Sequence, residues 1–192
     1  MAPKIKFTKE QIVQAAFDIA EVHGIDSITI RRVANQIGSS IAPIYVNFKN
    51  VDELKEAVTE KILDIGQQLI EAQQTGSTFM DIGMASLKFA RDYPVFFRDV
   101  HLKPNRSKAD YDDTLGDELI EQLKGDPEFK DFTEKEIKEM LLKMRIFQTG
   151  LSTMIANNQL SPDIGEKEAI HLLQRMGEDL MIGTHRRKNK DE

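Results

Sequence analysis

Hydrophobic residues recur every three or four positions along nearly the whole chain, and this spacing predicts an all-α protein of about nine helices. The first helix has clear end signals. Thr8 with Gln11 forms a capping box, Phe7 with Ile12 forms a hydrophobic staple, and Gly24 ends the helix. Its buried face is expected to carry Ile12, Ala16, Ile19 and Ala20.

Two further helices follow closely. One begins at Thr29 and stops at Gly38, and the next begins at Ser40, where the serine is expected to act as N-cap. This arrangement is a helix-turn-helix. The second of these helices is very short: Ile44 and Phe48 share the face that must be buried. Its outward face carries Tyr45, Asn47 and Lys49. A short helix held by two apolar anchors fits a DNA major groove.

The remaining pattern predicts longer helices. A fourth helix begins at Asn50, with Glu53 as reciprocal cap, and keeps helical spacing for more than four turns. Ser77 or Thr78 opens another helix that ends before Pro94. The expected segments after it are a short aromatic helix at 95–101, a loop at 105–113, a helix at 114–124, a helix from the Thr133–Glu136 capping box to about Asn158, and a last helix from near Ser161-Pro162 to about Thr184, followed by a frayed tail.

Length and composition limit the possible classes. A chain of 192 residues with 40% hydrophobic and 30% charged residues is typical of one or two globular domains. We predict a domain at 1–52 and a second at 53–192. No apolar run approaches the roughly 18 residues that span a bilayer, and no secretory signal is visible, so we expect a cytoplasmic protein. The absence of cysteine excludes disulfides and cysteine-ligated zinc.

The formal charge of −6 is distributed unevenly. Residues 1–50 carry six basic and four acidic side chains, whereas residues 110–139 carry twelve acidic side chains and four lysines. Phosphate contact requires only a local positive face, so the acidic total is compatible with DNA binding. An ordinary solvated acidic surface explains residues 110–139 at least as well.

The helix-turn-helix also carries a specific combination of residues: Thr29, Ala34, Gly38, Ser40, Tyr45, Phe48, Glu53 and Leu54. In this combination the stretch from Thr8 to about Leu63 resembles the tetracycline-repressor (TetR) family of transcriptional regulators. It departs from the usual family pattern at Ala42-Pro43, Asn47 and Val51, which bears on the operator sequence more than on the fold. The resemblance implies double-stranded DNA as a partner, met at Thr29, Arg31, Ser39, Ser40, Ala42, Pro43, Tyr45, Asn47 and Lys49.

The residue types suit these roles. Thr29 can donate to a phosphate, and Arg31 can reach a phosphate or a guanine edge. Tyr45 and Lys49 suit the phosphate backbone, whereas Asn47 suits adenine. Ile41, Ala42 and Pro43 suit a thymine methyl group. A solvated face or an intramolecular ion pair is the expectation for Arg32.

The second half of the chain is rich in Met and Phe, which at helical spacing form either a plain core or a deformable apolar pocket. The predicted ligand-binding residues are Met84, Phe89, Tyr93, Phe97, Met144, Phe147 and Gln148. Further polar candidates are Arg91, His101 and Arg145. The helix from Thr133 has a seam that alternates by four and three. With the last helix it is, by family resemblance, the homodimer interface, predicted at Leu141, Gly150, Leu151, Ile155, Leu173, Gly177 and Leu180.

Catalytic signals are poor. The four histidines lack metal-ligand spacing, and neither a Gly-rich phosphate loop nor a nucleophile elbow is present. We therefore predict no catalytic residue, no metal, no cofactor and no enzyme activity. The leading hypothesis is a homodimeric repressor that binds a palindromic operator and responds to an unknown small apolar effector. The alternatives are a partner-protein-regulated member and a helical carrier or enzyme with a vestigial DNA-binding domain.

Overall fold

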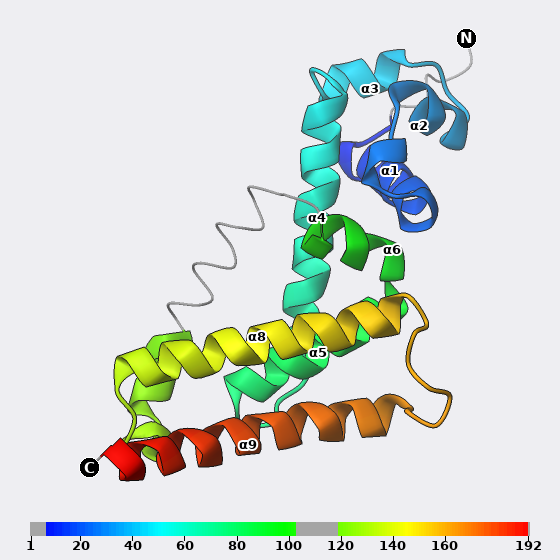
Figure 1. Cartoon of the computed structure of the whole chain (residues 1–192). Coiled ribbons are helices and arrows are strands. Elements are labelled where there is room, and N and C mark those ends of the chain that lie inside the picture. Colours follow the sequence, from blue (N-terminus) through cyan, green and yellow to red (C-terminus); the bar gives the residue numbers. More distant parts are fainter. Residues whose placement is uncertain (1–6, 103–118, 192) are drawn as a thin grey trace.

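The computed structural model describes residues 7–102 and 119–191, and within these ranges every regular element is a helix (Figure 1). The all-α fold class is therefore confirmed. The elements are α1 (Lys9–His23), the 3-10 helix η1 (Ile25–Ser27), α2 (Ile30–Gln36), α3 (Ala42–Asn47), α4 (Val51–Glu71), α5 (Thr78–Asp92), α6 (Pro94–Phe97), the π-helix η2 (Arg98–Leu102), the 3-10 helix η3 (Pro127–Phe129), α8 (Glu134–Ala156) and α9 (Glu166–Asp191). Residues 119–125 are also helical. The predicted loop at 105–113 and the start of the helix expected at 114–124 lie outside the described residues.

Helix starts follow the sequence signals closely, because a cap needs only residues that are neighbours along the chain. In five N-caps the side chain accepts a hydrogen bond from the backbone N–H three residues later: Thr8, Thr29, Asn50, Ser77 and Thr133. Complete capping boxes occur at Thr8 and Thr133. These starts are confirmed.

Three local predictions are wrong. Ser40 is not the N-cap of α3: that position is Ile41, and no side chain caps the helix. Pro43 has no N–H, so a cap at Ser40 would lack one of its two usual donors. Glu53 accepts a hydrogen bond from the backbone N–H of Lys49, not from that of Asn50.

The third wrong prediction concerns α9, which begins at Glu166 and continues to Asp191. The residues after Ser161 instead form a turn, in which the N–H of Ile164 donates to the carbonyl of Ser161. At the other end the hydroxyl of Thr184 donates to the carbonyl of Leu180 within the helix. The basic residues beyond Thr184 suit the negative end of the helix dipole, so the helix is not broken there.

The molecule is elongated, with α3 at one end, α8 and α9 at the other, and α4 between them (Figure 1). One large hydrophobic cluster joins α1, α2, α3 and the first half of α4 to α6 and to Ala156 at the end of α8. Two smaller clusters lie beside α8. One joins α5, α8 and α9 and contains Leu87, Met144 and Leu173, and the other joins residues 119–132 to α8 and contains Leu123, Phe132 and Ile137. Within the described residues, the helices are too short or too polar to cross a membrane.

Candidate nucleic-acid interface

We call the two helices of the helix-turn-helix, α2 and α3, the reading head. The orientation of α3 is fixed by two buried side chains. Ile44 is fully buried and Phe48 is 2% exposed. At about 100° per residue, the helix direction opposite these two anchors passes through Val46, whose exposed fraction is 83%. The helix therefore presents its outward face, centred on Val46, to solvent.

The turn between the two helices is fixed by backbone hydrogen bonds. The N–H of Ser39 donates to the carbonyl of Ala34, and the N–H of Gly38 donates to that of Asn35. This is the pairing of a Schellman motif, which satisfies the last carbonyl groups of α2. Gly38 has φ +64°, in the region where a residue without a Cβ is favoured. The chain is thereby turned into α3 without a side-chain cap.

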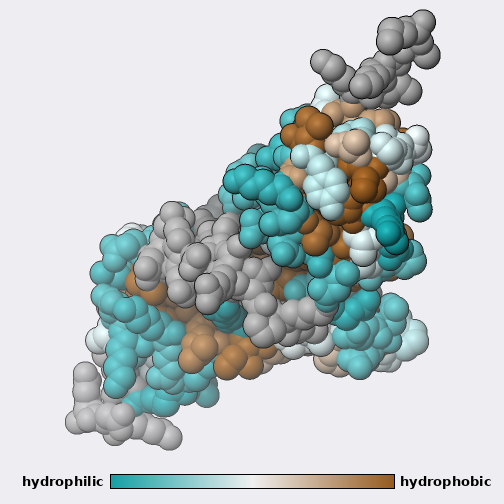
Figure 2. Space-filling model, turned by 90° about the horizontal axis from the view of Figure 1, so that it is seen from above, coloured by the Kyte–Doolittle hydropathy of each residue, from teal (hydrophilic) through white to brown (hydrophobic). Residues whose placement is uncertain are grey.

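The predicted DNA-contacting residues lie together at the start of α2, in the turn and on α3. Six are exposed: Thr29, Arg31, Ser40, Ala42, Tyr45 and Lys49. Ser39, Pro43 and Asn47 are partly buried. The exposed group combines hydroxyls and positive charges, which are the donors that phosphate contacts require. Seen from this end, the surface mixes hydrophobic and polar side chains (Figure 2).

Two polar side chains of the reading head are already engaged within the chain. The side-chain amide of Asn47 donates to the carbonyl of Pro43 at 2.8 Å, so one of its two N–H groups is engaged within α3. The guanidinium of Arg32 donates to the carbonyl of Ser27 at 3.2 Å. Arg32 is exposed, in agreement with the solvated face expected for it, and its partner here is a backbone carbonyl and not the carboxylate of an ion pair.

Val46 and Lys9 are candidate contact residues that sequence reasoning missed. Val46 could have been found from its position opposite Ile44 and Phe48, but an apolar residue was not expected on an outward face. Lys9 lies with its ammonium nitrogen 5.3 Å from the centre of the Phe48 ring, which adds positive charge beside the end of α3. No local signal links Lys9 to a residue so far along the chain.

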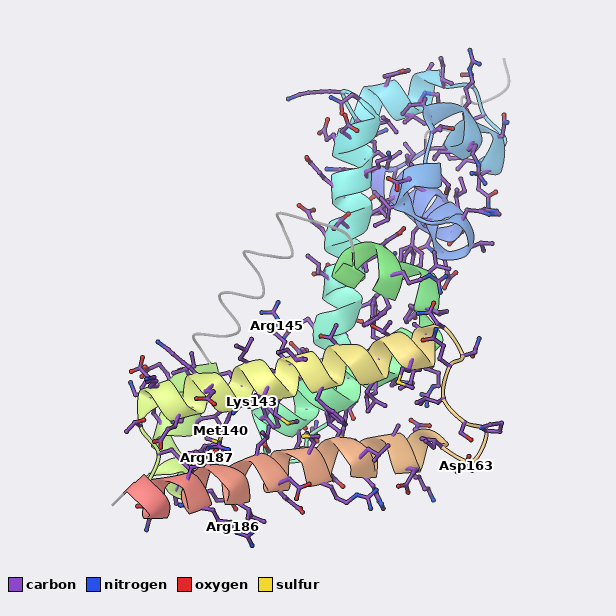
Figure 3. All side chains as sticks on the ribbon, in the orientation of Figure 1. Met140, Lys143, Arg145, Asp163, Arg186 and Arg187 are labelled. Atoms are coloured by element: carbon purple, nitrogen blue, oxygen red, sulfur yellow. The ribbon has the colours of Figure 1, made fainter. Side chains whose placement is uncertain are left out.

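A cleft of about 330 Å³ lies between α5, the end of α8 and the start of α9. Of the predicted ligand-binding residues, Met84 lines this cleft, as does the polar candidate Arg91. Phe89, Phe97 and Met144 are buried in hydrophobic clusters, while Tyr93, Phe147 and Gln148 are partly buried. Arg145 points away from α9 (Figure 3). The side chain of His101 lies outside the described residues.

The predicted dimer residues divide into two groups. Leu151 and Leu173 are buried inside the protomer, at 6% and 1% exposure. Leu141, Ile155, Gly177 and Leu180 are partly buried, and Gly150 is exposed. The large apolar side chains that α8 and α9 leave most exposed are different ones: Leu142, Ile146, Met154 and Ile182.

Comparison with known proteins identifies similar structures and one curated relative. No protein-family model matches the sequence. A stretch of 64 residues is 31% identical to the HTH-type nicotine-responsive transcriptional repressor HdnoR of Paenarthrobacter nicotinovorans. The match covers 33% of this chain, and the chain spans about a third of that relative's length, 31%.

Solved structures match over nearly the whole chain. A TetR-like transcriptional regulator from Rhodococcus sp. RHA1 has a TM-score of 0.68 at 15% identity, with 95% of this chain and all of the other covered. TetR from Acinetobacter baumannii AYE has a TM-score of 0.58 at 17% identity, with 94% and 98% covered. The chain therefore has the fold of these TetR-like regulators, which confirms the resemblance found in the sequence.

Proposed function

We propose that the chain is a homodimeric transcriptional repressor that acts in the cytoplasm, binds a palindromic operator through α2 and α3, and is released by a small, mainly apolar effector. The observation that carries this proposal is the orientation of α3. Its two large apolar anchors are buried, and the opposite face is exposed beside Tyr45, Lys49 and Arg31. A helix presented in this way is suited to enter a major groove.

Each exposed group has a defined task in this proposal. Tyr45, Lys49 and Thr29 bind phosphates and set the orientation of the reading head, while Arg31 binds a phosphate or a guanine edge. Val46 contacts a thymine methyl group at the centre of the face. Asn47 stabilises α3 through Pro43, which leaves its second N–H and its carbonyl oxygen for a base edge.

Dimerisation is assigned to the exposed stripe of α8, with α9 beside it. Leu142 and Ile146 are 57% and 65% exposed, lie four residues apart, and are followed on the same side by the exposed Gly150. Ile182 adds 51% exposed apolar surface on α9. A two-fold axis through this stripe would present two reading heads to the two halves of a palindrome.

Two similar proteins respond to or bind a small molecule, which supports release by an effector. The curated relative is described as nicotine-responsive, and one similar structure is a variant of TetR from Acinetobacter baumannii AYE in complex with minocycline. A ligand can weaken operator binding only by its differential affinity for the two states of the protein.

Fluorescence anisotropy with a duplex from the region upstream of the chain's own coding sequence tests the proposal. Tyr45→Ala and Lys49→Ala should greatly weaken binding while the circular dichroism spectrum is unchanged. Lys49→Ala should also make the slope of log affinity against log salt shallower by about one unit. Lys167→Ala, an exposed lysine of α9, is the matched control and should leave affinity unchanged. Equal affinity in all four proteins would refute the assignment of α3.

A further inference from the structure

The cleft between α5, α8 and α9 has an apolar floor. Met84 and Leu87 of α5, Ile155 of α8, and Ala169 and Ile170 of α9 line it. Leu87 and Ala169 are buried, at 5% and 3% exposure, so the floor is continuous with the cluster beneath it. The volume of about 330 Å³ is near the lower end of the roughly 300–1,000 Å³ typical of ligand pockets. The cleft therefore suits a small molecule with an apolar body.

The rim of the cleft carries two cations and one anion. Lys88, Arg91 and Glu166 line it. A guanidinium nitrogen of Arg91 lies 2.5 Å from a carboxylate oxygen of Glu166, and Asp92 pairs with Lys88 at 2.7 Å and with Arg91 at 3.0 Å. Hydrogen bonding to Glu166 raises the pKa of Arg91, and the same bond lowers the pKa of Glu166, so both are charged at neutral pH.

The Arg91–Glu166 pair is easily exchanged for another partner. The side chains of Arg91 and Glu166 are 38% and 57% exposed, and exposed ion pairs contribute little to stability. A ligand carboxylate offers Arg91 the same planar acceptor that Glu166 offers, and two of the three guanidinium nitrogens can hold it. Glu166, once displaced, returns to water at little cost.

We propose that this cleft is the effector site and that it binds an amphipathic carboxylate, whose head group replaces Glu166 on Arg91 and whose apolar body covers Leu87 and Ala169. The proposal names the effector class and the site, and it rests on the proposed function for its regulatory consequence. Ligand binding itself is independent of that function.

A route from the cleft to the reading head runs through two consecutive residues. Ile155 and Asn158, which line the cleft, flank Ala156, and the carbonyl of Ala156 accepts a hydrogen bond from the guanidinium of Arg98 at 3.1 Å. The next residue, Asp99, accepts a hydrogen bond from the backbone N–H of Ile25 at 2.6 Å. Arg98 and Asp99 thus tie the end of α8 to the turn between α1 and α2.

The contact at that turn is close. A Cβ atom built on Gly24 would lie 2.8 Å from the carboxylate of Asp99, so a larger residue there would push that carboxylate away from the turn. A ligand that moves the end of α8 therefore displaces Arg98, and Asp99 carries the displacement to the chain that positions α2. In this way occupancy of the cleft changes the orientation of the reading head.

Calorimetry with octanoate tests the site without DNA. Wild-type protein should bind octanoate more tightly than 1-octanol and octyltrimethylammonium, which share its tail. Arg91→Met should lower the affinity for octanoate about tenfold or more, as expected for the loss of a charge-assisted hydrogen bond. Glu166→Gln should tighten octanoate, because the competing carboxylate is gone. Arg175→Met, which breaks the exposed Arg175–Glu168 pair of α9, should change nothing.

Methyl NMR locates the ligand. Octanoate should shift the signals of Met84 and Met154, which line the cleft, and leave that of Met140, which points from α8 toward α9 (Figure 3). Absence of octanoate binding, tighter binding of the cationic probe, or shifts confined to Met140 would each overturn the site. The result stands whether or not the chain binds DNA.

Operator anisotropy with and without octanoate tests the route. Octanoate should weaken operator binding by wild-type protein about 5- to 150-fold. Arg98→Met should bind octanoate normally but lose this response. An unchanged response in Arg98→Met would overturn the route, and operator affinity insensitive to bound octanoate would overturn the effector role. Loss of all operator binding in every variant would instead refute the proposed function, and calorimetry would still decide the site.

Discussion

The two ends of the molecule differ in how completely they are packed. At the reading-head end, a single cluster of twenty buried residues continues from α1 through α4 and α6 to Ala156. At the other end, α8 and its neighbours form clusters of only five and four buried residues, a cleft lies between α5, α8 and α9, and the side chains of Leu142 and Ile146 are exposed on α8. The first region has one continuous core and leaves Val46 exposed on α3, whereas the second has a core divided into small clusters and leaves Leu142 and Ile146 exposed on α8.

The largest expected effect is on the free energy of unfolding, which should depend on the region in which a phenylalanine is removed. Phe96 is fully buried and packs against Phe17 with the rings tilted and their centres 4.8 Å apart, whereas Phe147 is only partly buried. Phe96→Ala should lower the free energy of unfolding by about 3–5 kcal/mol, and Phe147→Ala by less. Urea unfolding followed by circular dichroism measures both values. Equal losses would contradict the difference in packing.

A second prediction concerns the exposed stripe of α8. Leu142→Glu combined with Ile146→Glu should raise the dimer dissociation constant at least about 100-fold, because two buried apolar contacts become charged. Sedimentation velocity should show folded monomers, and operator affinity should fall. Leu151→Glu is the contrasting variant: it places a charge inside the protomer and should unfold it. Dimers that persist in the double variant would place the interface elsewhere.

A smaller effect is expected at the centre of the reading head. Val46→Ala should weaken operator binding by about tenfold, because two methyl groups no longer cover a thymine methyl. Replacing the contacted thymine with uracil should lower the operator affinity of wild-type protein by a similar factor. The same replacement should leave the operator affinity of Val46→Ala almost unchanged. Scanning each operator thymine in this way identifies the contact. If the loss of affinity from uracil at every position were as large in Val46→Ala as in wild-type protein, Val46 would not contact a thymine methyl group.

The smallest effect compares two helix starts. Asn50 accepts a hydrogen bond from the N–H of Glu53, whereas Ser40 makes no cap to α3. Asn50→Ala should therefore lower the free energy of unfolding by about 1 kcal/mol. Ser40→Ala should change it by less than about 0.5 kcal/mol, as for an ordinary surface position. A loss at Ser40 as large as that at Asn50 would reinstate Ser40 as a cap.

The sequence predicted the reading head well because its signals are local. The caps at Thr29 and Asn50, the glycine turn and the buried pair Ile44 and Phe48 each involve residues a few positions apart. Local reasoning failed at Ser40, where a proline removed a donor. It also passed over Val46, because polar residues were expected on the outward face.

The second half of the chain could not be resolved in the same way. Ile146 and Leu151 are both apolar residues of α8, and they differ only in which side of the helix they occupy relative to α5 and α9. Helical spacing alone does not say whether an apolar side is covered by the same chain or by another. The hydrogen bond between Ile25 and Asp99 joins residues 74 positions apart, so no local sequence pattern predicts it.

Gly24 has a consequence for how this protein can vary. It has φ +85° and touches Asp99, so a replacement there meets backbone strain and a steric clash together. A library of single substitutions selected for repression should retain glycine at this position. Variants that repress but ignore the inducer should instead carry changes at Arg98, where a side chain can be lost without forcing the backbone. In the proposed repressor, substitutions at Arg98, and not at Gly24, are therefore the ones expected to separate operator binding from the response to the effector.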